Sequence, residues 1–171
     1  METLLVTIAV IAMGEMGSGV ARRLVERGAR VLTSLDGRSS ASVDRAKAAG
    51  VEIVNDADLI DQAEMFLSIV PPSSVAATAE RFVTIIERAA NKPVFIDCNA
   101  IAPQTLHAVS KPFLQRGLPF GDASIIGPAP RPDGYSPRLY MSGPIAREAD
   151  SLKALGLESL SYRRVWAMLR R

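Results

Sequence analysis

Three small residues follow an apolar run near the start of the chain, at a spacing that suits phosphate binding. Ala12, Gly14 and Gly17 come directly after "VTIAVI" and give the pattern A-x-G-x-x-G. Small residues allow a tight turn, a close approach of the backbone to a phosphate, and close packing of a helix on a strand. Free N–H groups at the start of that helix attract anions. The pattern indicates a dinucleotide cradle, and a βα turn that binds no ligand is the alternative.

A second polar group comes about twenty residues further along, where a dinucleotide-binding chain contacts the adenosine ribose. The stretch "SLDGRSS" offers both Asp36 and Arg38. An acidic residue there binds the ribose hydroxyls of NAD, whereas an arginine pairs with the 2′-phosphate of NADP. Ser39 and Ser40 add hydroxyl donors beside Arg38. An exposed Asp-Gly turn is the alternative, and we favour NADP over NAD.

Apolar, β-branched runs alternate with longer amphipathic stretches, which is typical of βαβ units that build a parallel sheet. The runs are almost entirely apolar, as expected for strands that helices cover on both faces. The expected strands cover residues 4–11, 29–35, 64–70, 93–98 and 118–126. The sequence therefore predicts an α/β protein with a doubly wound, mainly parallel sheet and helices on both faces.

The stretches between these runs predict helices and one long loop. "MGSGVARRLVERGA" places Val20 and Leu24 on one side and most of its charged residues, including Arg23, outside. "SSVAATAERFVTIIERAA" repeats this spacing, and a third helix is expected at "PQTLHAVSK", which Pro112 should end or kink. Residues 127–144 are rich in proline and glycine and predict a long loop with a late strand, "RLYMSG".

Length and composition narrow the class of protein further. At 171 residues, with 48% hydrophobic residues, the chain suits one packed domain, which we place at residues 1–156, with a short tail or helix at 157–171. The net charge of +2 is too small to indicate nucleic-acid binding, and the apolar start is far shorter than the ~20 residues of a membrane span. Cys98 is the only cysteine, so no intramolecular disulfide, no metal and a cytoplasmic location are expected.

Four motifs together resemble those of a known superfamily. They are "AMGEMGSGVARRL", "DGRSS", "SIVPPSSV" and "DCNAIAP". Over about residues 4–145 the chain resembles the N-terminal domain of the β-hydroxyacid dehydrogenases, most of all their 6-phosphogluconate dehydrogenase-like branch. The resemblance implies a Rossmann-type NADP-binding domain. The cofactor-binding residues that it implies are Ala12, Gly14, Glu15, Met16, Gly17, Arg38, Ser39, Val70, Pro71, Pro72 and Asn99.

Within this set, the resemblance assigns the glycine loop to the pyrophosphate, Arg38 and Ser39 to the adenosine phosphate, and "VPP" to the nicotinamide side. It also places Asn99 and Gly127 in substrate-binding loops. Two departures bear on the substrate: Asn99-Ala100 stands where the family usually has a Ser-Thr pair, and Ile126-Gly127-Pro128 replaces Ser-Gly-Gly. We therefore expect a substrate other than a standard small hydroxy acid.

The family's proton acceptor is a lysine at the start of a helical C-terminal domain, in a pattern like G-x-x-x-K-x-x-x-N. None of Lys47, Lys92, Lys111 and Lys153 stands in such a pattern, and that domain has no counterpart in the sequence. We assign no catalytic residue and leave open whether the chain acts as an enzyme. The first hypothesis is the NADP(H)-binding domain of a 6-phosphogluconate or 3-hydroxyisobutyrate dehydrogenase-like oxidoreductase. It is expected to be inactive alone and to present an exposed apolar face to a partner domain or a second copy.

Two alternatives stay open. The first is a non-catalytic nucleotide-binding or interaction module that works with a partner chain. The second is an S-adenosylmethionine-dependent methyltransferase, whose glycine-rich loop is similar. "GRSS" disfavours the methyltransferase, because that cofactor has no phosphate to pair with Arg38.

Overall fold

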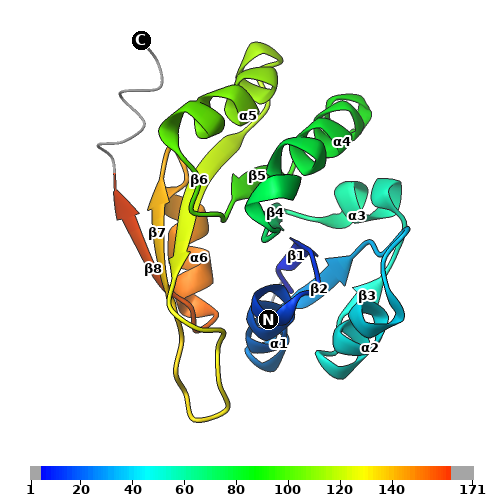
Figure 1. Cartoon of the computed structure of the whole chain (residues 1–171), viewed down its shortest axis with the longest axis vertical. Coiled ribbons are helices and arrows are strands. Elements are labelled where there is room, and N and C mark those ends of the chain that lie inside the picture. Colours follow the sequence, from blue (N-terminus) through cyan, green and yellow to red (C-terminus); the bar gives the residue numbers. More distant parts are fainter. Residues whose placement is uncertain (1–4, 163–171) are drawn as a thin grey trace.

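An eight-stranded sheet runs through the centre of the protein in the computed structural model, which describes residues 5–162 (Figure 1). The strands lie in the order β3-β2-β1-β4-β5-β6-β7-β8. They span Thr7–Ile11 (β1), Arg30–Thr33 (β2), Glu52–Ile53 (β3), Met65–Ser68 (β4), Val94–Asp97 (β5), Phe120–Ile126 (β6), Arg138–Ser142 (β7) and Glu158–Tyr162 (β8). The helices are Glu15–Glu26 (α1), Ser40–Ala48 (α2), Asp56–Gln62 (α3), Val75–Arg88 (α4), Pro103–Gln115 (α5) and Ala146–Ala154 (α6), and the 3₁₀ turn η1 is Pro72–Ser74.

The sheet is parallel from β3 to β6, β7 runs antiparallel to β6, and β8 pairs in parallel with β7. The strand order reverses between β1 and β4, and open α/β sheets bind ligands at such a switch point. The carboxyl ends of β1, β4 and β5 meet at one edge, where Ser68 pairs with Asp97. Asp97 in turn pairs with Asp122 of β6, which continues past this edge to Ile126. The doubly wound, mainly parallel sheet predicted from the sequence is confirmed.

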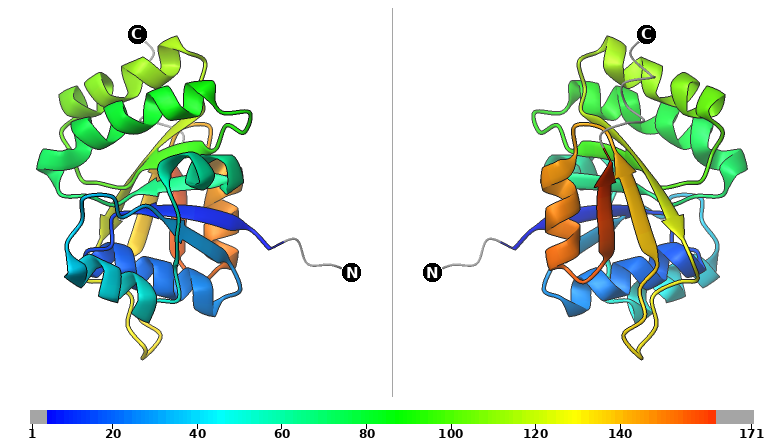
Figure 2. Two further views of the ribbon diagram at one scale, coloured as in Figure 1. Left: turned by 90° about the vertical axis from the view of Figure 1, so that its right-hand side faces the viewer. Right: turned by 90° about the vertical axis from the view of Figure 1, so that its left-hand side faces the viewer.

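Helices cover both faces of the sheet and enclose two hydrophobic cores (Figure 2). Buried residues of α1, α2 and α6 belong to one core, and those of α3, α4 and α5 belong to the other. Five phenylalanine rings form the centre of the second core, with ring centroids 4.6–5.8 Å apart; they are Phe66, Phe82, Phe95, Phe113 and Phe120. Each buried ring contributes on the order of 2 kcal/mol, so this cluster fixes α4 and α5 on the sheet.

Each of the five expected strands is present within its predicted range, and the late strand is β7. The helices predicted from apolar spacing are α1, α4 and α5. The patterns in the sequence do not predict α2, α3 and α6 or the two-residue strand β3. α5 also differs in its length, because it continues through Pro112 to Gln115. Val109 and Phe113 are buried on either side of this proline and hold the helix on the core.

The end of the described chain differs from the prediction. Residues 158–162, expected in a tail or helix, form β8, which pairs with β7 from Arg138 beside Glu158 to Ser142 beside Tyr162. Leu157 and Ser159 are buried whereas Glu158 and Leu160 are exposed, which is the period of a strand. The sheet therefore extends past residue 156, and residues 163–171 of the predicted tail lie outside the described residues.

The position of Arg23 also differs from the prediction. It was expected on the outer side of α1, but it is buried, with only 7% of its surface exposed. Its guanidinium donates to the carbonyl oxygens of Arg131 (2.9 Å), Tyr135 (3.1 Å) and Gly156 (3.4 Å). These bonds compensate for the burial of the charge. They also tie α1 to the loop after β6 and to the turn before β8.

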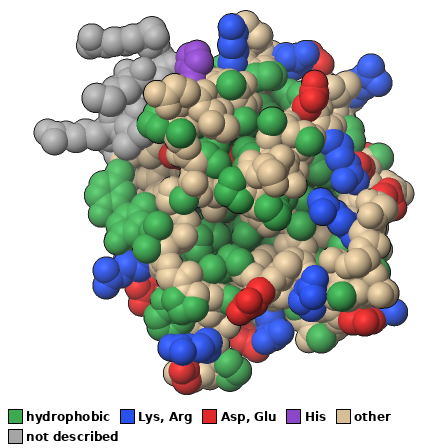
Figure 3. Space-filling model, in the orientation of Figure 1, with side chains coloured by type: hydrophobic (Ala, Val, Ile, Leu, Met, Phe, Trp, Pro, Cys, Tyr) green, Lys and Arg blue, Asp and Glu red, His purple; other side chains and the backbone are tan. Residues whose placement is uncertain are grey.

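One face of the last three strands carries exposed apolar side chains. Ala123, Leu139 and Met141 point into the core that α6 shares, so their neighbours along each strand point to the opposite face. On that face Ile126 is 53%, Leu160 41% and Tyr162 49% exposed. We call it the open face of β6–β8, and Figure 3 shows hydrophobic side chains gathered over these strands.

Candidate dinucleotide site

The turn between β1 and α1 leaves the first N–H groups of the helix without a side-chain cap. Gly14 is the N-cap residue, in extended backbone. Ala12 N–H donates to the carbonyl oxygen of Ile69 (3.0 Å), which fixes the turn against the loop after β4. A Cβ at Gly17 would overlap the Ala12 carbonyl oxygen, whereas nothing lies within 4 Å of a Cβ at Gly14. Gly17 is required for packing, and Gly14 faces open space at the helix start, where anions bind.

A hollow of about 350 Å³ opens at this turn, at the switch point of the sheet. Residues from four separate segments line it: Ala12, Gly14, Glu15, Met16, Gly17, Arg38, Ser42, Ile69, Val70 and Pro71. Eight of these are among the residues predicted from the sequence. Ser42 and Ile69 were not predicted. Ser42 lies on α2, whose sequence lacks a strong apolar stripe, and Ile69 follows a strand whose continuation into the loop no local pattern marks.

Four predicted site residues do not line this hollow. Ser39 is the N-cap residue of α2, with its Oγ 3.3 Å from Ser42 Oγ, and Pro72 begins η1. Asn99 is buried behind the loop after β4. Gly127 begins the loop after β6 with a φ of +119°, and a Cβ there would overlap the Tyr135 hydroxyl.

Two arginines give the hollow and its rim a positive charge. The Arg38 side chain is exposed and has no hydrogen-bond or ion-pair partner among residues 5–162, so its guanidinium is available to a ligand. Arg45 was not singled out from the sequence. Its Nε donates to the carbonyl oxygen of Met13 (2.6 Å) and its Nη2 to Ser42 Oγ (3.3 Å). Arg45 therefore fastens α2 to the glycine turn and holds Ser42 beside Arg38.

Asn99 joins the loops that follow β4 and β5. Its Oδ1 accepts from Val70 N–H (3.0 Å), and its Nδ2 donates to the Ser68 carbonyl oxygen (3.1 Å) and to Asp97 Oδ1 (2.7 Å). The side chain can make about four hydrogen bonds, so most of its capacity is used inside the protein. Direct contact of Asn99 with a cofactor or substrate stays a prediction.

Two carboxyls lie side by side beneath these loops. Burial raises the pKa of Asp97 to about 7, while the hydrogen bond from Asn99 lowers it and the charge of Asp122 raises it. Burial also raises the pKa of Asp122 to about 6, against the hydrogen bond from Ser142. The buried Cys98 thiol has a pKa well above its ordinary value for the same reason. The two carboxyls therefore gain and lose protons near neutral pH.

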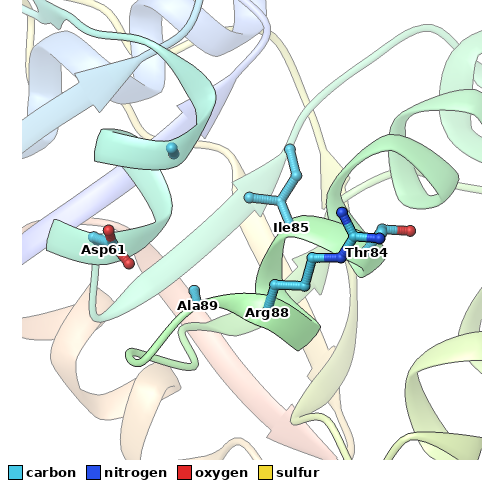
Figure 4. Close-up of a pocket in the computed structure, with 6 residues that line it drawn as sticks. Asp61, Thr84, Ile85, Arg88 and Ala89 are labelled. Atoms are coloured by element: carbon cyan, nitrogen blue, oxygen red, sulfur yellow. The ribbon is translucent and has the colours of Figure 1, made fainter.

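Other hollows lie on the described residues, including one of about 500 Å³ between α4 and α5 and one of about 480 Å³ between α1 and the loop after β6. A hollow of about 270 Å³ lies between α3 and α4, where Asp61 lies across from Ile85 and Arg88 (Figure 4), and it shares no residue with the hollow at the glycine turn. Within residues 5–162, no three His, Cys, Asp or Glu side chains are grouped so that they could hold a metal ion. The helices in that range are too short or too polar to span a bilayer.

The glycine turn and the hollow at the switch point define the class of dinucleotide-binding α/β domains. Within this class, the family described as the NAD binding domain of 6-phosphogluconate dehydrogenase matches residues 7–132, and the chain belongs to that family. A 3-hydroxyisobutyrate dehydrogenase from Pseudomonas aeruginosa (strain PAO1) is 29% identical over 122 residues, which is 70% of this chain and 40% of that protein. The chain thus spans less than half the length of this curated relative.

Solved structures share the fold over nearly the whole chain. One is a conserved protein of unknown function with structural similarity to 3-hydroxyacid dehydrogenases (30% identity, TM-score 0.79), and the match covers 93% of this chain and 58% of that one. An imine reductase from Myxococcus stipitatus with NADP⁺ is 15% identical (TM-score 0.71; 92% and 54% covered), and its variant with NAD⁺ is also 15% identical (TM-score 0.70; 94% and 55% covered). At this identity the likeness concerns the fold alone. The family match makes the chain an NAD(P)-binding domain of the 6-phosphogluconate dehydrogenase type.

Proposed function

We propose that the hollow binds NADP(H) in preference to NAD(H). The observation that carries this proposal is the free guanidinium of Arg38 on the wall of the hollow that Ser42 and the glycine loop also line. Arginine pairs with a phosphate through two parallel hydrogen bonds. Asp36, the competing ribose ligand, is exposed and does not line the hollow. In this proposal Arg38, Ser39 and Ser42 hold the 2′-phosphate.

The glycine loop fits the pyrophosphate. The space beside Gly14 lets a phosphate reach the N–H groups of Glu15 and Met16 at the start of α1, and the bare Cα of Gly17 lets the helix approach Ala12. On the opposite wall, Val70, Pro71 and Pro72 would contact the nicotinamide side. The nicotinamide ring, when bound, accepts or donates a hydride. We also propose that a substrate contacts the chain at Gly127, at the carboxyl end of β6.

Hydride transfer to or from a hydroxyl carbon also needs a proton acceptor near that carbon. No lysine of the described residues lines the hollow. Lys92 is fully engaged at the end of α4, where its Nζ donates to the carbonyl oxygens of Ile86 (2.8 Å), Glu87 (2.7 Å) and Ala89 (2.7 Å). We therefore propose that this chain binds the dinucleotide of an oxidoreductase, and that the proton acceptor comes from residues outside it.

The open face of β6–β8 is where we propose that this additional domain packs. The solved relative is longer than the part that this chain matches, since only 58% of it is covered. The last described residue, Tyr162, lies on the open face, so a domain joined to the chain after β8 would begin beside it. The second candidate is a non-catalytic module that works with a partner chain. It is favoured by the same observation, that no lysine of the described residues lines the hollow.

A fluorescence titration with NADPH and NADH tests the cofactor proposal. We expect NADPH to bind at least about tenfold more tightly, because one pairing of arginine with a phosphate contributes about 1.4 kcal/mol or more. Arg38→Ala should bring the two affinities within about threefold of each other and leave NADH binding unchanged. Arg147→Ala, an exposed arginine on α6, is the matched control and should change neither affinity.

Three results would contradict this function. They are equal or tighter binding of NADH, a ratio of affinities that Arg38→Ala leaves unchanged, and no binding of either dinucleotide at millimolar concentration. The second candidate has its own test, in which the chain is mixed with a separately produced helical domain of a relative. Activity that appears only in the mixture supports a partner chain, and activity of this chain alone excludes it.

A further inference from the structure

A row of polar groups, two of them fully buried and the third, Asp122, partly buried, crosses the sheet beneath the cofactor hollow. Ser68, Asp97 and Asp122 are neighbours in register on β4, β5 and β6. Ser68 and Asp97 are both 0% exposed. Within residues 5–162, Ser68 Oγ and Asp97 Oδ2 have no hydrogen-bond partner. Buried polar atoms without partners are costly, so this row needs a reason other than stability.

Asn99 connects this row to the wall of the hollow. Its Oδ1 accepts a hydrogen bond from the N–H of Val70, which lines the hollow together with Ile69 and Pro71. Its amide also donates to the Ser68 carbonyl oxygen, which in addition accepts the N–H of Cys98 (2.9 Å). One side chain thus holds both the last residue of β4 and the loop that follows it.

The same loop is bound to the glycine turn from the other side. Ala12 N–H donates to the Ile69 carbonyl oxygen (3.0 Å), and Ile69 N–H donates to the Ile11 carbonyl oxygen. Ile69 and Val70 therefore lie between β1 and β5, held by Ala12 on one side and by Asn99 on the other. The width of the hollow between Gly14 and Pro71 depends on both attachments.

Asp97 fixes the direction in which the Asn99 amide points. Its Oδ1 accepts from Asn99 Nδ2 at 2.7 Å, so the amide nitrogen faces β5 and the amide oxygen faces Val70 N–H. If the amide were turned over, an oxygen would face a carboxylate oxygen and an NH₂ group would face an N–H. Both contacts would be repulsive, so the carboxyl selects one of the two orientations.

We propose that Asn99 is a positioning residue of the dinucleotide site: it sets the place of the Val70–Pro71 wall without touching the ligand, and Asp97 orients it. The proposal rests on the proposed function, because it assigns the wall to the nicotinamide side. The asparagine in "DCNAIAP" thus has a role inside the protein where the family pattern has a hydroxyl residue. The hydrogen bond by which Asn99 holds Val70 can be tested without any ligand.

The test compares Asn99→Ala with Asn91→Ala, using two measurements. Asn91 is a matched control because its Nδ2 also donates two hydrogen bonds, to the carbonyl oxygens of Ile60 (3.0 Å) and Ala63 (2.6 Å), but at the opposite edge of the sheet. In Asn99→Ala we expect amide hydrogen exchange at Val70 to become about tenfold faster, and the Kd for NADPH to rise about tenfold. In Asn91→Ala we expect both values to stay within about twofold of wild type.

A second pair of variants covers the case in which Asn99→Ala does not fold. Asp97→Ala removes the acceptor that orients the amide and should weaken NADPH binding several-fold. Asp97→Asn keeps an oxygen for Asn99 Nδ2 and should restore most of the affinity lost in Asp97→Ala. A purely structural role would weaken binding only in proportion to the loss of unfolding free energy, so the affinity of each variant is compared with its stability in urea.

Each outcome decides the proposal. Unchanged exchange at Val70 in Asn99→Ala overturns it, and so does an equal loss of affinity in Asn91→Ala or the absence of rescue by Asp97→Asn. If the wild-type chain binds neither dinucleotide, the proposed function fails. In that case exchange at Val70 still decides whether Asn99 holds the loop.

Discussion

Asp97→Asn gives a quantitative test of the buried carboxyl row. In the folded protein, burial raises the pKa of Asp97 to about 7 from an ordinary value of 3.8. Between these values the folded state keeps a proton that the unfolded state has lost. The contribution of Asp97 to the unfolding free energy therefore falls as the pH rises from about 4 and stops falling above about 7.

The size of this effect follows from the two pKa values. At about 1.4 kcal/mol for each tenfold change in proton affinity, the span from 3.8 to about 7 corresponds to ~4 kcal/mol. About 1 kcal/mol of this is lost by pH ~4.5 and nearly all of it by pH ~8. The asparagine variant has the same shape and cannot ionise. Relative to wild type, it should therefore gain about 3 kcal/mol in unfolding free energy between these two pH values, or about 10 °C in melting temperature.

Urea unfolding of both proteins at the two pH values measures this gain directly. Titrations of groups that do not interact with Asp97 cancel because only the difference between variant and wild type is used; Asp122 is the neighbouring carboxyl that does interact with it. Asp44→Asn removes an exposed carboxyl of α2 and serves as the control, with no expected change in that difference. If Asp97→Asn and wild type lose stability in parallel from pH ~4.5 to ~8, the burial argument for Asp97 is refuted.

Three further variants test local features of the fold, each by urea unfolding. Gly17→Ala should cost about 3 kcal/mol because its Cβ meets backbone, while Gly14→Ala should stay within about 1 kcal/mol of wild type; equal effects would contradict the packing role. Asn55→Ala should cost about 1 kcal/mol, since Asn55 Oδ1 accepts from Asp58 N–H (2.9 Å) and caps α3; no loss would show that the cap is dispensable. Arg45→Ala should also cost about 1 kcal/mol by freeing α2 from the glycine turn, and unchanged stability would argue against that attachment.

The parts of the fold that the sequence predicts are those encoded by neighbouring residues. The central strands are unbroken apolar runs, and α1, α4 and α5 have apolar residues at helical spacing. α2 has one buried residue, Ala46, and therefore no apolar stripe to recognise. α3 is only seven residues long, with two buried residues. β8 has one buried residue among five, Ser159, so its sequence does not separate it from a tail.

The candidate site likewise has residues that local motifs predict and residues whose roles depend on distant parts of the chain. The glycine turn and Arg38 belong to local motifs, and the structure brings them together in one hollow. The use of Asn99 could not be predicted, because its partners Ser68 and Val70 lie 31 and 29 residues away along the chain. Arg45 was missed for a related reason, since its partner Met13 is 32 residues away. Hydrogen bonds of this kind become visible only when the strands are placed beside one another.

The buried guanidinium of Arg23 imposes an order on folding. α1 belongs to the first βα unit, but the carbonyl oxygens that its guanidinium meets lie 108, 112 and 133 residues further along. Closing such long loops is slow and entropically costly, and a charge buried before its partners arrive is unfavourable. The first βα unit can therefore form early only with Arg23 still in water. Burial of the Arg23 side chain on α1 therefore requires the loop after β6 and the turn before β8 to be folded against the helix.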